Sequence, residues 1–277
     1  KNTYHEHLLD SLVAPTTNRQ IEGDDATFAT INAPTRVGNY QQISRKTFIV
    51  TGTLEEVAKA GRKKEAARQM MKQMRELKNE MEYALVRNQA SSAGGSATAR
   101  STAGMESWIA TNEILATTSA GATTPGFASG TVAAPTDGTT TGALTENALK
   151  AALQAAWDQG GKVSEVLVNA TQKNAIDAFS GQAVRQIDVG RRDQLSVVAA
   201  VNLYVSSYGT VKVRLHRFVR NSVVLCLDPD YWAVSFLRRP FKEKLAKTGD
   251  GEKHMILAEY GLVSRNQAGS AKIVSCA

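Results

Sequence analysis

The sequence has few of the residues that build disulfide-rich, aromatic-rich or membrane-spanning proteins. Of its 277 residues, two are cysteine, six are proline and 6% are aromatic. Two cysteines cannot form a disulfide framework, and Cys226, within the apolar run 223–227, is typical of a small core residue in a reducing environment. No apolar run approaches the roughly 20 residues that span a bilayer, and no signal-peptide pattern follows Lys1. We therefore expect neither a membrane protein nor a secreted one.

Positive charge exceeds negative charge, but the excess is diffuse. The chain carries 33 lysines and arginines against 26 aspartates and glutamates, which gives a net charge of +7. A nucleic-acid-binding protein usually concentrates its basic residues on one face or one element. The sequence instead favours an ordinary solvated surface that tolerates a polyanion nearby.

One pair of residues has the spacing of metal ligands. His5 and His7 would lie on one face of a strand, and imidazoles in that arrangement can bind zinc. No third ligand completes a site, because the other histidines, His216 and His254, lie far along the chain. We interpret His5 and His7 as polar residues of an exposed segment and predict no metal.

No catalytic motif is complete. The run Gly160-Gly161-Lys162 is similar to a phosphate-binding loop, but it lacks two of the motif's residues and follows a helix instead of preceding one. Asp228 and Asp230 flank a proline in a pattern typical of a turn. We therefore predict a structural protein with no enzymatic activity, no catalytic residues and no cofactor.

The first 53 residues have the pattern of a long β-hairpin. Residues 2–12 and 40–52 have strand character, and the segment 13–38 between them is rich in turn-forming residues. A connection of that length inside a compact domain is uncommon. We expect an extended arm that contacts another molecule.

A long helix is predicted directly after this arm. Thr53 and Glu56 form a capping box, and no proline interrupts residues 54–89. Its apolar stripe has spacings of 4, 3, 4 and 3 residues and consists of Met70, Met74, Leu77, Met81 and Ala84. Such a helix would be about 54 Å long.

The rest of the chain predicts a flexible region followed by a mixed core. Residues 90–145 are low in complexity, with a docking segment at Trp108 and Ile109 and a flexible loop at 117–141. Thr145 is a candidate N-cap for a helix that packs through Ala148, Leu149, Leu153, Ala156 and Trp157. A second helix is expected at 171–179, and strands at 163–168, 195–205, 211–217, 222–227, 231–237 and 255–264. This composition indicates an α+β fold.

Several motifs in order resemble one group of proteins. They are NYQQISRKTFIVTGT at 39–53, GMESWI at 104–109, LDPDYWA at 227–233, LAKTGD at 245–250 and EYGLVSRN at 259–266. With TYHE at 3–6, GRK at 61–63 and RPF at 239–241, they cover nearly the whole chain apart from the loop at 117–141. Together they are similar to the major capsid proteins of tailed double-stranded DNA bacteriophages.

This resemblance implies the Hong Kong 97-like capsid fold. Residues 1–53 would form the extended arm, and 54–144 a peripheral domain with the helix 54–89 as its spine. Residues 145–235 would form a mixed α/β axial domain. Residues 236–277 would return as strands to the peripheral domain.

The resemblance also implies a function. The chain would assemble with itself into pentamers and hexamers of an icosahedral head in the host cytoplasm and remain in the virion. Its other partners would be a portal, decoration or scaffolding proteins, and packaged DNA held by non-specific contact. Relatives usually carry residues before the TYHE segment, so we expect removal of an N-terminal segment by a maturation protease. No residue pair identifies a covalent crosslink.

The candidate contacts between subunits are charged residues of the arm. Arg45 and Lys46 would pair with Asp24 or Asp25 of a neighbouring subunit, since opposite charges on exposed segments attract. Three alternatives remain: another phage structural protein of the tail or of the head decoration, a non-specific DNA-binding protein, and an unrecognised enzyme.

Overall fold

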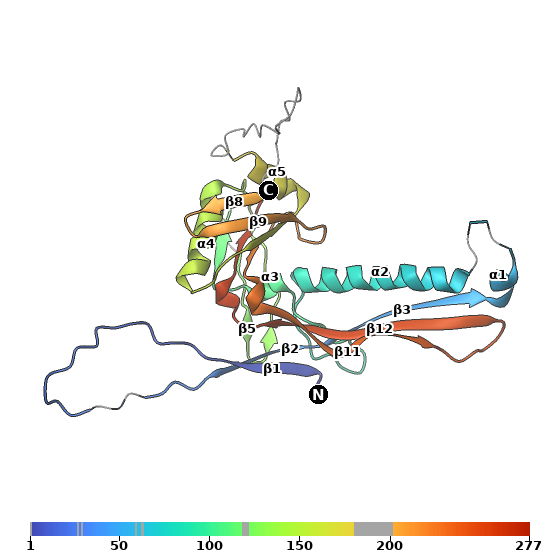
Figure 1. The fold of residues 1–277 in the computed structure, drawn as a ribbon, viewed down its shortest axis with the longest axis horizontal. Helices are drawn as coiled ribbons and strands as arrows, with labels where there is room; N and C mark the ends of the chain where they lie inside the picture. The colour runs from blue at the N-terminus through green and yellow to red at the C-terminus, as the bar shows by residue number, and fades with distance from the viewer. Residues whose placement is uncertain are drawn as a thin grey trace, which may run out of the picture.

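The computed structural model describes residues 2–26, 28, 30–58, 60, 61, 64–117, 122–179 and 202–277. Figure 1 shows an upright body at one end of a long layer, in which the helix α2 (Glu65–Val86) lies along a three-stranded sheet. A loop extends from the base of the molecule on the side away from α2.

The layer is built on the longest strand. β12 (Gly251–Ser264) pairs antiparallel with β11 (Trp232–Lys244) on one side and with β3 (Gln42–Thr51) on the other. Leu77 and Met81 of α2 pack on Ile256 and Tyr260 of β12 in one apolar cluster. The predicted apolar stripe is confirmed at its C-terminal end, whereas Met74 is 40% exposed.

The predicted continuous helix 54–89 is wrong. The structure contains a short α1 (Gly52–Glu56), then a break, then α2. Thr53 lies inside α1 instead of at its N-cap position, which Thr51 occupies without a side-chain hydrogen bond, so the predicted capping box does not form. Gly61 adopts a φ of +73°, which is not helical. Glu55 instead accepts hydrogen bonds from the amides of Glu65 and Ala66, at 3.0 and 3.3 Å, and so caps α2. With 22 residues, α2 is about 33 Å long.

The predicted hairpin pairs differently. β1 (Tyr4–Leu9) pairs with β2 (Thr35–Tyr40), from Leu9 opposite Thr35 to Tyr4 opposite Tyr40. Residues 42–51, predicted as the second strand of the arm, form β3 and pair with β12. The chain changes partner at Gln41, which is buried and donates its backbone amide to Thr3. Local alternation identified the strand but not its partner, which lies near the other end of the chain.

The upright body contains a six-stranded sheet in the order β4-β13-β10-β7-β9-β8. Two helices, α4 (Glu146–Asp158) and α5 (Ala170–Asp177), belong to this body. The strands are β4 (Glu113–Leu115), β7 (Glu165–Val168), β8 (Leu203–Ser206), β9 (Gly209–Leu215), β10 (Val224–Leu227) and β13 (Ala271–Val274). Short 3₁₀ turns at Pro229–Tyr231 and Gln267–Gly269 connect the last strands.

The packing of α4 largely follows the sequence prediction. Thr145 caps the helix by accepting a hydrogen bond from the amide of Ala148. Leu149 and Leu153 are buried in the largest apolar cluster, as predicted. Trp157, predicted on the same face, is 58% exposed. Of the strand predicted at 195–205, residues 195–201 lie outside the described residues.

The low-complexity region is more ordered than predicted. Trp108, in α3 (Met105–Trp108), is buried together with Ile109, as expected. Within the predicted flexible loop, β5 (Phe127–Ala128) pairs with β6 (Thr131–Val132). Phe127 stacks on Trp108 with ring centroids 5.8 Å apart, and Val132 is fully buried. Residues 118–121 of that loop lie outside the described part.

The turn after α4 supplies a test of the packing. A Cβ atom at Gly161 would lie 2.1 Å from the carbonyl oxygen of Gly269, so the backbones there approach too closely for any side chain. We expect Gly161→Ala to lower the free energy of unfolding by about 1–3 kcal/mol, in the range of overpacked sites. Thermal denaturation of the unassembled subunit measures this change.

The matched control is Gly95→Ala, where an added Cβ would meet no atom within 4 Å. Its melting temperature should equal that of the unmodified chain. Equal melting temperatures for both variants would contradict the close approach at Gly161.

Candidate functional site

The two histidines with metal-ligand spacing, His5 and His7, lie on β1, and His7 has a structural role. His7 donates from Nε2 to the carbonyl oxygen of Ser264 at 2.8 Å, which fastens β1 to the end of β12. The rings of His5 and His7 lie 6.2 Å apart. Burial, and secondarily His7, lowers the pKa of His5, which favours its neutral form. Among the described residues, no group of three or more histidine, cysteine or acidic side chains could hold a metal.

The other candidate chemical groups are also structural. Asp228 accepts from the amide of Lys162 at 2.9 Å and from that of Asp230 at 3.2 Å, as expected for a turn. Cys226 and Cys276 are buried free thiols. Burial raises the pKa of each thiol to about 12, so neither forms the reactive thiolate near neutral pH.

The predicted contact residues lie in two separate places. Arg45 and Lys46 belong to β3, whereas Asp24 and Asp25 are exposed in the loop between β1 and β2. The side chain of Lys46 points to α2 and pairs with Glu80, a hydrogen bond that raises the pKa of Lys46. Arg45 is exposed on the other face of the sheet. The single chain thus brings none of the predicted pairs together, and their contact between subunits stays a prediction.

The loop between β1 and β2 is exposed throughout its described residues. Its residues 10–26, 28 and 30–34 are all exposed. Large apolar side chains are among them, with exposures between 77% and 100%, namely Leu12, Val13, Ile21, Phe28 and Ile31. The sequence predicted this loop as part of an extended arm from its turn-forming residues, and the isolated apolar residues were a further signal that the prediction did not use.

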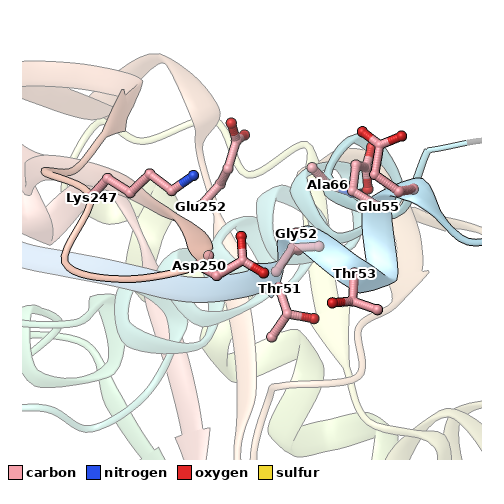
Figure 2. Close-up of a pocket in the computed structure, with 11 residues that line it drawn as sticks. Thr51, Gly52, Thr53, Glu55, Ala66, Lys247, Asp250 and Glu252 are labelled. Carbon is pink, nitrogen blue, oxygen red and sulfur yellow. The ribbon is translucent and has the colours of Figure 1, made fainter.

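An acidic hollow lies at the far end of the three-stranded sheet. Figure 2 shows Asp250 beside Gly52 at the junction of β3 and α1, with Glu55, Lys247 and Glu252 around it. The amide of Gly52 donates to the carbonyl oxygen of Asp250 at 3.3 Å. This contact joins the turn between β11 and β12 to the start of α1. The carboxylates are exposed or engaged locally, so the hollow has no group poised for catalysis.

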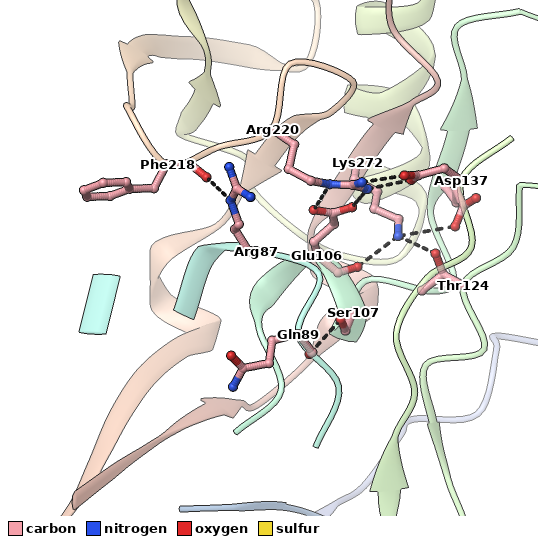
Figure 3. A network of polar contacts seen from close by, with 10 residues as sticks. Arg87, Gln89, Glu106, Ser107, Thr124, Asp137, Phe218, Arg220 and Lys272 are labelled. Atoms are coloured by element: carbon pink, nitrogen blue, oxygen red, sulfur yellow. Dashed lines mark hydrogen bonds and ion pairs between the residues drawn. The ribbon is translucent and has the colours of Figure 1, made fainter. Parts of the chain in front are cut away.

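A buried polar network holds the region 122–141 against the body (Figure 3). Arg220 makes a two-pronged contact with Glu106, which is 2% exposed, and a second one with Asp137 at 2.5 and 2.6 Å. Lys272, fully buried, donates to the carbonyl oxygen of Glu106 at 2.9 Å and to the hydroxyl of Thr124. Both Asp137 and Thr124 belong to the low-complexity region. The network therefore orders a segment that has little apolar surface of its own.

The charges of this network stabilise one another. The hydrogen bonds from Arg220 lower the pKa of Asp137, and its two carboxylate partners raise the pKa of Arg220. Burial lowers the pKa of Lys272, although Glu113, 3.4 Å away, opposes that shift. Sequence reasoning missed the network because its members lie far apart along the chain.

Comparison with known proteins identifies the family. The family model of the SU10 major capsid protein matches residues 1–277. The chain belongs to the SU10 major capsid protein family. It is thus a major capsid protein, a structural component of a bacteriophage head. A search of curated proteins gave no match.

Solved structures agree with the fold of this family. The capsid of cyanophage A-1(L) is 14% identical with a TM-score of 0.59, over 99% of this chain and 88% of that one. The structure of phage G major capsid and decoration proteins is 12% identical with a TM-score of 0.54, over 100% and 85%. An encapsulin complex of Synechococcus elongatus is 9% identical with a TM-score of 0.55, over 89% and 77%. At these identities the likeness shows the mixed α+β, Hong Kong 97-like fold.

This SU10-family chain has no helix, within its described residues, that is both long and apolar enough to cross a membrane. Its structural role in the capsid follows from the family.

The buried network supplies a test of what holds the region 122–141. Glu106→Gln would leave the charge of Arg220 with only one carboxylate, and we expect it to cost about 3 kcal/mol of unfolding free energy. Asp137→Asn should cost less, because Asp137 is half exposed, but should raise hydrogen exchange in 122–141. Chemical denaturation and hydrogen exchange followed by mass spectrometry measure the two effects. Unchanged hydrogen exchange of residues 122–141 in both variants would contradict the role of this network in holding the region.

The contact between Asp137 and Arg220 has a defined pH dependence. Since the pKa of Asp137 is lowered in the folded chain, its stabilising contribution is complete above the ordinary carboxyl value of 3.8. It is lost as the pH falls through the lowered value. We expect the exchange protection of 122–141, corrected for intrinsic rates, to stay constant from pH 7 to about 5 and to fall only below about pH 4. Protection lost near pH 6 would indicate a histidine instead.

Proposed function

We propose that this major capsid protein assembles into pentamers and hexamers that close an icosahedral head around double-stranded DNA. The exposed loop between β1 and β2 is the observation that carries this proposal. Its apolar side chains have no cover within the described chain, and assembly with neighbouring subunits would remove them from water. The proposed head assembles in the host cytoplasm, without enzymatic activity of the subunit, and joins a portal and decoration or scaffolding proteins.

The parts of the subunit then take the roles known for this fold. The loop with β1 and β2 is the extended arm, α2 is the spine helix of the peripheral domain, and the upright body is the axial domain. Strand pairing supports two adjustments of the boundaries 1–53, 54–144, 145–235 and 236–277. β3 belongs with the peripheral sheet, since it pairs with β12. β4 and β13 belong with the axial sheet, since they pair with each other and β13 pairs with β10.

Removal of the loop tests the proposal without disturbing the fold. Leu9 lies opposite Thr35, so residues 10–34 can be replaced by Asn-Gly, a two-residue turn that suits a tight hairpin. We expect the unmodified chain to form closed shells or curved sheets in negative-stain electron microscopy. The shortened chain should keep its melting temperature within a few degrees and remain as free subunits or small rings.

Three outcomes would overturn the proposal. Tubes or isolated trimers of the unmodified chain would favour a tail or decoration protein. Shells that form equally well without the loop would show that the loop is not needed for assembly. Monomers of the unmodified chain, even with phage assembly factors added, would argue against a shell-forming subunit.

A further inference from the structure

β1 is fastened to the three-stranded sheet through two histidines. His7 donates from Nε2 to the carbonyl oxygen of Ser264 at 2.8 Å. The Nδ1 atom of His5 lies 3.5 Å from the hydroxyl of Ser235, which accepts a hydrogen bond from the side chain of Gln41 at 3.2 Å. Among the described residues, backbone pairing joins β1 to β2 alone. The two imidazoles therefore connect β1 to β11 and β12, and we call them the histidine anchor.

The hydrogen bonds of the histidine anchor suit neutral rings. Because Nε2 of His7 donates, its Nδ1 atom carries the lone pair of the neutral imidazole. That Nδ1 atom is buried and has no hydrogen-bond partner among the described residues. A second proton there would be a buried donor without an acceptor, which costs free energy. The hydroxyl of Ser235 can donate to Nδ1 of His5 only while that nitrogen carries no proton.

The charges around the histidine anchor oppose a positive charge on it. Among the described residues that line the hollow beside the two rings, Arg265 is the one charged group other than the histidines themselves. β2 places no ionisable residue opposite either histidine. Glu6 lies on the other face of β1, where it pairs with Arg36 at 3.7 Å, and Glu259 of β12 is bound to two arginines. Within the described part of the chain, a protonated ring here forms no ion pair with a carboxylate.

The other two histidines of the chain have the opposite surroundings. The Nε2 atom of His216 lies 2.7 Å from a carboxylate oxygen of Glu82, and that of His254 lies 3.6 Å from one of Glu252. When either ring is protonated, a carboxylate therefore lies beside the new charge. Mild acid is thus expected to weaken the histidine anchor without weakening these two contacts.

The pKa of His5 gives the pH range of this effect. Burial, and secondarily the charge of His7, lowers the pKa of His5 from its ordinary value of 6.5. A histidine whose pKa is lower in the folded chain than in the unfolded chain contributes its full stabilisation above the ordinary value. That stabilisation is lost as the pH falls through the lowered value. The contribution of His5 is therefore complete above pH 6.5 and is lost in more acidic solution.

We propose that the histidine anchor is acid-sensitive: it holds β1 on the sheet near neutral pH and releases β1 once both rings are protonated. Two imidazolium ions with ring centroids 6.2 Å apart would repel each other, and Arg265 would repel both. β2 would stay in place, because the side chain of Asn39 is bonded to the carbonyl oxygen of Leu262 in the core. The proposal concerns the single chain and goes beyond its assembly.

Hydrogen exchange of the unassembled subunit tests the release. Exchange is followed by mass spectrometry and corrected for intrinsic rates. The protection of Tyr4–Leu9 should stay constant from pH 8 to 7 and fall at least about tenfold from pH 7 to 5, since each unit by which folding lowers a pKa is worth a factor of about ten. Residues 122–141, which Arg220 holds separately, should keep their protection over the same range. Constant protection of Tyr4–Leu9 down to pH 5 would overturn the proposal.

Glutamine variants assign the effect to the histidine anchor. His5→Gln and His7→Gln together keep side chains that donate and accept hydrogen bonds but do not titrate. At pH 7 their β1 protection should stay within about threefold of the unmodified chain, and it should not fall at pH 5. The matched control, His216→Gln with His254→Gln, should lose β1 protection in acid as the unmodified chain does. A control that keeps it, or an anchor variant that loses it, would overturn the proposal.

A second measurement needs no variant. Nuclear magnetic resonance of the imidazole C–H groups follows the protonation of each histidine in the unmodified subunit. The midpoint for His5 should lie below 6.5, and the protection of β1 should be lost over the same pH range. A midpoint at or above 6.5, or protection lost at another pH, would overturn the proposal even where every variant misfolds. Neither measurement uses a shell, so the histidine anchor and the proposed assembly fail separately.

Discussion

The fold depends on one long strand that is paired on both sides and covered on both faces. β12 joins β11, its neighbour in sequence, to β3 from the start of the chain. One face packs on α2 through Ile256 and Tyr260. On the other face Glu259 is held by Arg100 and Arg238, at 2.5 and 2.8 Å. Because β12 is fixed in every direction, α2 and the root of the arm share one rigid base.

The root of the arm is held by this rigid base, whereas the loop beyond the root makes few contacts. Asn39, at the end of β2, donates from its side chain to Thr102, Ala103 and Leu262, so the root of the arm is anchored in the core. Beyond Leu9 and Thr35 the pairing ends, and the loop has only local hydrogen bonds in its described residues. The core therefore sets the direction in which the loop leaves the molecule, whereas few contacts fix the conformation of the loop itself.

The sequence predicted what is locally encoded. The cap at Thr145 and the buried Leu149 and Leu153 follow from short-range pattern and are confirmed. The helix predicted at 54–89 was too long, because Val57 and Lys64 are extended and Gly61 adopts a positive φ between α1 and α2. The partner of β3 and the contacts of Arg220 depend on residues far along the chain, which periodicity cannot reveal. The capsid function came from the resemblance of several ordered motifs, not from any reactive group.

The composition of the arm suits a contact that is weak alone and strong when repeated. Ordering the loop 10–34 costs about 1–2 kcal/mol for each residue whose backbone becomes fixed. Burial of a large apolar side chain returns about 1.5–3 kcal/mol, and the loop carries only a few of them. Their burial alone therefore does not repay the ordering of the whole loop. A contact of the arm is weak by itself, and we expect stable binding only where many such contacts form at once, as in the proposed shell.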